Sequence, residues 1–188
     1  GWSSVDTAEE ILQKLKLAGI NLSDDPSCCV ATGYGRISVP YADKAVTEIT
    51  CHALGAVHLF HQPDLTVIDI GGQDTKIIQI EQGFVKDFIM NDKCAAGTGR
   101  FLEVMANTLS LRPNEMFDLA RLGSDTTISS MCTVFAESEV IGLIGKGEPK
   151  ENIAYAVVDS TIRKVAAQVS RMNGEMSTFC LTGGLCEC

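Results

Sequence analysis

The sequence predicts a mixed α/β fold, and three observations support this prediction. Short β-rich segments follow one another through glycine-containing turns, which is typical of an antiparallel meander. Apolar residues at helical spacing then dominate the chain before one last β-rich segment runs into a Gly-Gly turn. The predicted strands are 65–70, 75–80, 84–90 and 178–181, and the predicted helices are 99–107, 114–122, 133–146 and 151–172.

The order of these elements predicts one ribonuclease-H-like lobe over residues 65–188, with residues 1–64 as the remainder of a first lobe. In the first part, a capping box at Thr7 to Glu10 predicts the start of a helix that Gly19 ends. Residues 28–32 are expected to form a short buried strand, and residues 43–59 a second helix. The apolar content of 45% is enough for a substantial core.

Composition excludes several classes of partner. The net charge of −9 argues against binding to nucleic acid or to an anionic membrane, since both require basic surfaces. No apolar run approaches the roughly 20 residues that span a bilayer. The eight cysteines follow no disulfide framework, and no signal peptide opens the sequence, so we expect a reducing cytoplasm.

The run Val67-Ile-Asp-Ile-Gly-Gly-Gln-Asp-Thr-Lys76 has the character of a phosphate loop. Gly71 and Gly72 let the backbone bend sharply and bring N–H groups to a phosphate. Asp69 is expected to hold Mg²⁺ through water, because this ion keeps most of its hydration shell. The alternative is a tight hairpin with polar surface residues.

Three polar side chains of the same run suggest catalysis. Gln73 and Asp74 are candidates for orienting an attacking water, and Lys76 for offsetting phosphate charge. Two further glycine turns are candidate nucleotide contacts, because each brings bare backbone to a ligand. Their residues are Gly97, Thr98 and Gly99 with Glu103 for the ribose, and Gly183 and Gly184 for the adenosine.

Cys94 and Cys132 each stand near the predicted start of a helix. Free N–H groups and the positive end of the helix dipole stabilise a thiolate or a metal cluster there. Two thiolates are too few for a four-cysteine site, whereas two copies of the chain would supply four. The alternative is a buried, unreactive thiol, which is the interpretation we favour for Cys28, Cys29 and Cys51.

These motifs resemble the BadF/BadG/BcrA/BcrD ATPase family, which includes activators of 2-hydroxyacyl-CoA dehydratases and ATP-hydrolysing subunits of benzoyl-CoA reductase. The resemblance rests on the phosphate-loop run and on Asn91-Asp-Lys-Cys-Ala-Ala-Gly-Thr-Gly-Arg-Phe-Leu-Glu103. Shorter matches are Ala31-Thr-Gly-Tyr-Gly-Arg36, Thr47-Glu-Ile-Thr-Cys-His-Ala53, Cys132-Thr-Val-Phe-Ala-Glu137 and Thr182-Gly-Gly184. It therefore spans nearly the whole chain.

The resemblance implies an actin/hexokinase/Hsp70-type ATPase fold, ATP or ADP with Mg²⁺, and a homodimer with one [4Fe–4S] cluster at its interface. Cys94 and Cys132 correspond to the cluster ligands of the family. The implied donor is ferredoxin or flavodoxin, and the implied acceptor is a 2-hydroxyacyl-CoA dehydratase or a benzoyl-CoA-reductase-like enzyme. An exposed cluster of this kind is oxygen-sensitive, so the resemblance also implies an anaerobic cytoplasm.

Family members also carry an earlier phosphate loop of the Asp-x-Gly-Ser/Thr type, and nothing before Cys28 fits that pattern. Family members also continue into closing helices after the turn that corresponds to Gly184, so the resemblance implies that the fold is incomplete at both ends. Two other functions stay open from the sequence. One is a small-molecule kinase of the same fold with incidental cysteines, and the other is a catalytically inactive module whose cysteines bind zinc.

Overall fold

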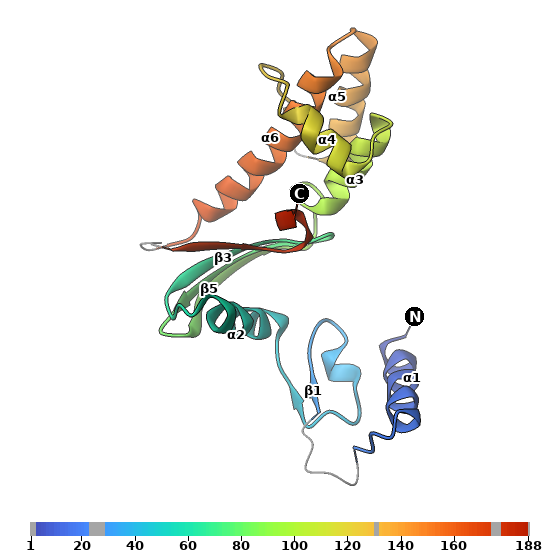
Figure 1. The fold of residues 1–188 in the computed structure, drawn as a ribbon, viewed down its shortest axis with the longest axis vertical. Helices are drawn as coiled ribbons and strands as arrows, with labels where there is room; N and C mark the ends of the chain where they lie inside the picture. Colours follow the sequence, from blue (N-terminus) through green and yellow to red (C-terminus); the bar gives the residue numbers. More distant parts are fainter. Residues whose placement is uncertain (1–2, 23–28, 130–131, 174–177, 188) are drawn as a thin grey trace. The chain divides into compact units, whose positions relative to one another are not determined.

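The computed structural model describes residues 3–22, 29–129, 132–173 and 178–187 (Figure 1). The chain forms two compact units, residues 1–61 and 62–188, and each is described by itself. Cys28 and Cys188 lie outside the described residues. Within the described ranges, no helix has both the length and the apolar composition needed to cross a membrane.

The first unit contains two α-helices and a two-stranded sheet. Its elements are α1 (Ser4–Leu17), β1 (Val30–Ala31), η1 (Arg36–Ser38), β2 (Lys44–Ala45) and α2 (Glu48–Phe60). The first helix begins earlier than the sequence predicts, because Ser3 and not Thr7 caps it. The Ser3 hydroxyl accepts a hydrogen bond from the Asp6 N–H at 3.2 Å, which satisfies one of the free donors at the helix end.

Two predictions in this unit need correction. The strand expected over residues 28–32 is reduced to β1, in which Ala31 is buried but Val30 is half exposed. The helix expected from Asp43 starts only at Glu48, where the Thr47 side chain accepts from the Thr50 N–H. The intervening β2 pairs in parallel with β1, and this pairing between distant residues removes the first turn of the expected helix.

The second unit is built on a four-stranded mixed sheet of order β5-β4-β3-β6. The strands β3 (Leu65–Ile70), β4 (Thr75–Glu81) and β5 (Phe84–Asn91) form the predicted antiparallel meander. The last strand, β6 (Phe179–Thr182), joins the other edge in parallel with β3. This register places Asp69 between Lys76 on β4 and Thr182 on β6.

Helices of the second unit gather on one side of the sheet (Figure 1). They are α3 (Gly99–Thr108), α4 (Pro113–Ala120), α5 (Thr133–Gly145) and α6 (Lys150–Val169), and the short η2 (Gly184–Glu187) follows β6. Their shared core includes fully buried Met105, Met116, Val140 and Val157. Val165 and Met172 connect the α6 end of this layer to Ile77 of the sheet. The mixed α/β, ribonuclease-H-like fold is therefore confirmed.

Candidate nucleotide and cysteine sites

The turn between β3 and β4 presents its backbone outward. The Gly71 N–H donates to the Asp74 carbonyl at 2.9 Å and closes the turn. Gly72 and Gln73 are exposed, and within the described structure their N–H groups have no protein acceptor. A Cβ atom added at Gly72 would meet only open space. Exposed N–H groups on a glycine turn can bind a phosphate oxygen.

Behind this turn lies a buried charge network centred on Lys76. Its ammonium group is 2.8 Å from a carboxylate oxygen of Asp74 and 3.5 Å from one of Asp69. Asp69 also accepts a hydrogen bond from the Thr182 hydroxyl at 2.8 Å. Two carboxylates around one ammonium leave the network with net negative charge, which suits a nearby hydrated cation. The role of Asp69 beside Mg²⁺ stays a prediction.

The start of α3 lies directly against the same turn. The N–H groups of Gly99 and Arg100 donate to the carbonyls of Gly71 and Gly72, at 2.9 and 2.7 Å. A Cβ on Gly99 would stand 3.2 Å from the Gly72 Cα, so this close approach favours glycine. The Thr75 hydroxyl adds a bond to the Gly97 carbonyl at 2.6 Å.

The third glycine turn, formed by Gly183 and Gly184, lies close to the carboxyl end of β3. Gly183 has φ of +95°, and a Cβ there would lie 2.3 Å from the Ile70 carbonyl oxygen and 3.0 Å from Asp69 Oδ1. Gly184 beside it faces open space. The structure therefore brings all three glycine turns, at 71–72, 97–99 and 183–184, to the carboxyl end of β3, although they are far apart in sequence.

For four other predicted site residues, the side-chain contacts do not establish the predicted roles. Thr98 is buried, and its hydroxyl bonds to the Ala95 carbonyl at 2.5 Å, inside the loop. Glu103 is exposed and forms an ion pair with Arg100 at 2.7 Å. Gln73 is exposed and makes no hydrogen bond within the described structure, whereas Lys76 is engaged by two carboxylates. The roles given to these side chains stay predictions.

The two cysteines lie in different settings. Cys94 is half-buried in the loop before α3, where it packs against the helical core. The Asn91 side-chain amide donates to the carbonyls of Cys94 and Ala96, at 2.9 and 3.1 Å, and so fixes this loop. Cys132 is exposed and is itself the N-cap residue of α5, with no side-chain capping bond.

Comparison with known proteins decides the family. Residues 3–188 match the BadF/BadG/BcrA/BcrD ATPase family. The chain belongs to this family. The (R)-2-hydroxyglutaryl-CoA dehydratase activating ATPase of Acidaminococcus fermentans is 47% identical over 170 residues, which cover 87% of this chain and 63% of that protein.

Two solved structures of family activators resemble this chain. The A. fermentans (R)-2-hydroxyglutaryl-CoA dehydratase component A has a TM-score of 0.76 and 44% identity, covering 91% of this chain and 66% of that one. The activator of the 2-hydroxyisocaproyl-CoA dehydratase from Clostridium difficile, with bound ADPNP, has a TM-score of 0.74 and 38% identity. The match covers 95% of this chain and 66% of that one. The chain thus spans somewhat under two thirds of these relatives, and its fold is that of an actin-type ATPase.

The chemistry of Cys94 and Cys132 is compatible with the cluster that the sequence analysis predicts. Thiolates are the usual ligands of iron–sulfur clusters, and both cysteines are at least partly accessible, Cys94 in the loop before α3 and Cys132 at the start of α5. Within the described residues, no group of three His, Cys, Asp or Glu side chains could hold a metal ion. The assignment of Cys94 and Cys132 as cluster ligands stays a prediction.

Sequence reasoning missed three residues that organise these sites. Thr182 bonds to Asp69, and Asn91 fixes the Cys94 loop, although both lie in motifs that the sequence analysis quotes. Lys164 on α6 was not considered, and its aliphatic stem lies against Gly97. No sequence signal reveals Lys164, since α6 reaches this loop only through the packing of the fold.

Proposed function

We propose that this chain belongs to an ATP-dependent electron-transfer activator. In this function, a [4Fe–4S] cluster bridges two copies of the chain through Cys94 and Cys132. Ferredoxin or flavodoxin supplies the electron, and a 2-hydroxyacyl-CoA dehydratase or a related CoA-ester reductase accepts it. The cluster supplies one-electron redox chemistry when it is bound. The observation that carries the proposal is the meeting of three glycine turns around Asp69 in a member of this ATPase family.

In nucleotide hydrolysis, different residues of the turn and of β3 bind the phosphates, hold the metal ion and orient the attacking water. Gly72 and Gln73 offer their N–H groups to the phosphates, while the Gly71 N–H closes the turn. Asp69 would hold a Mg²⁺ ion, which would offset phosphate charge. Gln73 orients the attacking water from the exposed tip of the turn. Since α3 is hydrogen-bonded to this turn, a change at the phosphates can reach the loop before α3 and its cysteine. Nucleotide state and cysteine position are thereby linked.

The deciding experiment measures iron, acid-labile sulfide and zinc per chain on protein purified without oxygen, together with its mass in solution. We expect about two irons and about two sulfides per chain in a dimer, because one four-iron cluster is shared by two chains. Zinc in place of iron would favour the zinc-binding module. A monomer that contains no iron after reconstitution would contradict the proposal.

Replacing Gln73 with alanine should slow ATP hydrolysis roughly 100-fold, the scale of one lost proton-transfer or water-positioning group. Because the side chain is exposed and makes no hydrogen bond within the described structure, nucleotide affinity and folding should stay nearly unchanged. Phosphate release and equilibrium nucleotide binding measure the two quantities. Gln13→Ala, at an exposed position on α1, is the matched control. Equal losses of binding and hydrolysis would contradict a water-orienting role.

Thiol labelling should identify the cluster ligands independently. The thiolate is the reactive form, and burial raises the pKa of the Cys180 thiol, with a further contribution from nearby Cys186. At pH near 8, iodoacetamide should therefore label exposed Cys132 and Cys186 quickly and Cys180 slowly. Iron loading should protect Cys132 and leave Cys186 reactive, as read by peptide mass spectrometry. Labelling of Cys132 at the same rate with and without iron would refute its role as a ligand.

A further inference from the structure

A basic face lies beside the Cys94 loop in a chain whose net charge is −9. We define this basic face as Lys93, Arg163, Lys164 and Arg171. Three of its members come from the last turns of α6 and the residues just after it, and Lys93 comes from the Cys94 loop. Lys93, Arg163 and Arg171 are exposed, and Lys164 is half-buried. Clustered cations on an otherwise acidic protein attract an anionic partner.

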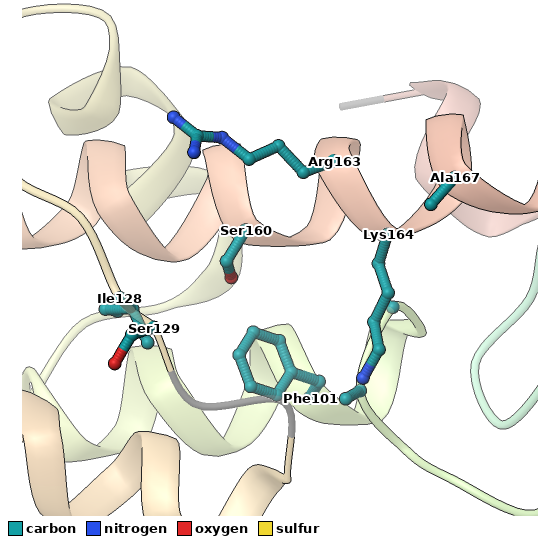
Figure 2. A pocket seen from close by; sticks show the side chains of 9 residues that line it. Phe101, Ile128, Ser129, Ser160, Arg163, Lys164 and Ala167 are labelled. Carbon is teal, nitrogen blue, oxygen red and sulfur yellow. The ribbon is translucent and has the colours of Figure 1, made fainter.

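Two neighbouring cavities hollow this basic face. The first, of about 320 Å³, lies between α6, α3 and the loops carrying Gly97 and Ser129, and contains Ser160, Arg163 and Lys164 in its wall (Figure 2). The second, of about 430 Å³, is lined by Asn91, Asp92, Lys93, Lys164, Gln168 and Arg171. Lys164 contributes to both cavities. Asp92 is the only carboxylate among the described residues that line either one.

The cationic side chains are presented toward solvent and toward the loop. Figure 2 shows Lys164 reaching from α6 toward Phe101, while Arg163 extends along the helix. The Arg163 Nε donates to Asp159 at 2.7 Å, yet its side chain remains 67% exposed. The terminal guanidinium nitrogens are thus available to a second carboxylate, and a guanidinium fork can bind two acceptors at once.

The spacing of these cations favours a large partner over a small anion. Arg163 lines the first cavity and Arg171 lines the second, and neither lines both. One phosphate or carboxylate group bound in either cavity would therefore engage only one of these two arginines. Several carboxylates on one protein surface can engage both, and complementary charge of this kind speeds association and fixes orientation.

We propose that the basic face is the docking surface for an acidic electron-carrying protein. The proposal rests on the proposed function, since it places the donor next to the loop that holds Cys94. Its chemistry is electrostatic recognition by carboxylates, and it needs no bond to be made or broken.

The test compares two double variants with the same loss of charge. Arg163→Ala with Arg171→Ala removes two cations of the basic face, and Lys146→Ala with Lys150→Ala removes two exposed cations from the opposite end of α6 and the end of α5. The probes are an acidic bacterial ferredoxin and a flavodoxin, with binding measured by calorimetry. We expect the first variant to bind its probe about tenfold more weakly and the control to bind as the parent does.

The salt dependence of binding and competition by phosphate complete the test. Raising NaCl from about 0.05 M to about 0.3 M should weaken the parent and the control steeply and the basic-face variant much less, because salt screens exposed charges. Equal binding by both variants would overturn the inference, as would failure of the parent to bind either probe at low salt. Displacement by phosphate at constant ionic strength would indicate a small-anion site and also overturn it. Iron content, measured on the same samples, reports separately on the proposed function.

Discussion

Cys132→Ala should reduce the iron content from about two per chain to near zero while the fold stays intact. Cys132 is exposed, caps α5 without a side-chain hydrogen bond, and contributes nothing to the buried core. Substitution at such a surface position changes stability by no more than about 0.5 kcal/mol. Loss of iron can then be assigned to loss of a ligand. Iron and sulfide assays, together with thermal unfolding of the same sample, measure both effects.

Cys186→Ala is the matched control, since this cysteine is also exposed and follows a glycine turn. It should retain the iron of the parent protein. Cys94→Ala should lose iron as well, but with a larger cost in stability, roughly 1 kcal/mol, because its side chain packs against the helical core. A Cys132→Ala protein that keeps its full iron content would refute the ligand assignment and favour a site elsewhere.

The second unit could be predicted well because its signals are local. The meander follows from β-rich segments joined by glycine turns, and β3 has the predicted bounds, Leu65–Ile70. The helix starts at Gly99 and Thr133 also agree with prediction, since a turn of small or hydroxyl residues precedes each one. Hydrophobic periodicity and turn chemistry act over a few residues, so one sequence is enough to show them.

The first unit was harder because its decisive contacts are not local. Lys44 and Ala45 pair with Val30 and Ala31, and such pairing overrides a helical pattern that extends a few residues too far. The start of α1 depends on a choice between two hydroxyl caps, Ser3 and Thr7, that sequence alone does not settle. Both are errors at element boundaries, where cap geometry decides.

For the candidate nucleotide site, the sequence motifs indicated which residues take part, and strand register determined which of them lie next to one another. The sequence shows Asp69, Lys76 and Thr182, but only the pairing of β3 with β4 and β6 places them side by side. That pairing also explains why Lys76 is held between carboxylates and is less available to a phosphate than its position in the motif suggests. Long-range register cannot be read from residue spacing.

Gly183→Ala should destabilise the second unit by about 3 kcal/mol and abolish nucleotide binding. The residue has φ of +95°, which is unfavourable for alanine, and the added Cβ would lie 2.3 Å from the Ile70 carbonyl oxygen. Backbone atoms on β3 cannot move aside as a flexible side chain can, so strain and clash add. Urea unfolding, with the slope unchanged from the parent, measures the loss in free energy.

Gly184→Ala separates the fold from the site. A Cβ at Gly184 meets nothing within 4 Å among the described residues beyond its chain neighbours, so the free energy of unfolding should change by less than about 0.5 kcal/mol. The same methyl group would project into the space where the adenosine is proposed to bind, and ATP affinity should fall roughly tenfold, or about 1.4 kcal/mol. Unchanged ATP affinity in this stable variant would move the adenosine away from the turn after β6, while leaving the argument for Gly183 and the fold untouched.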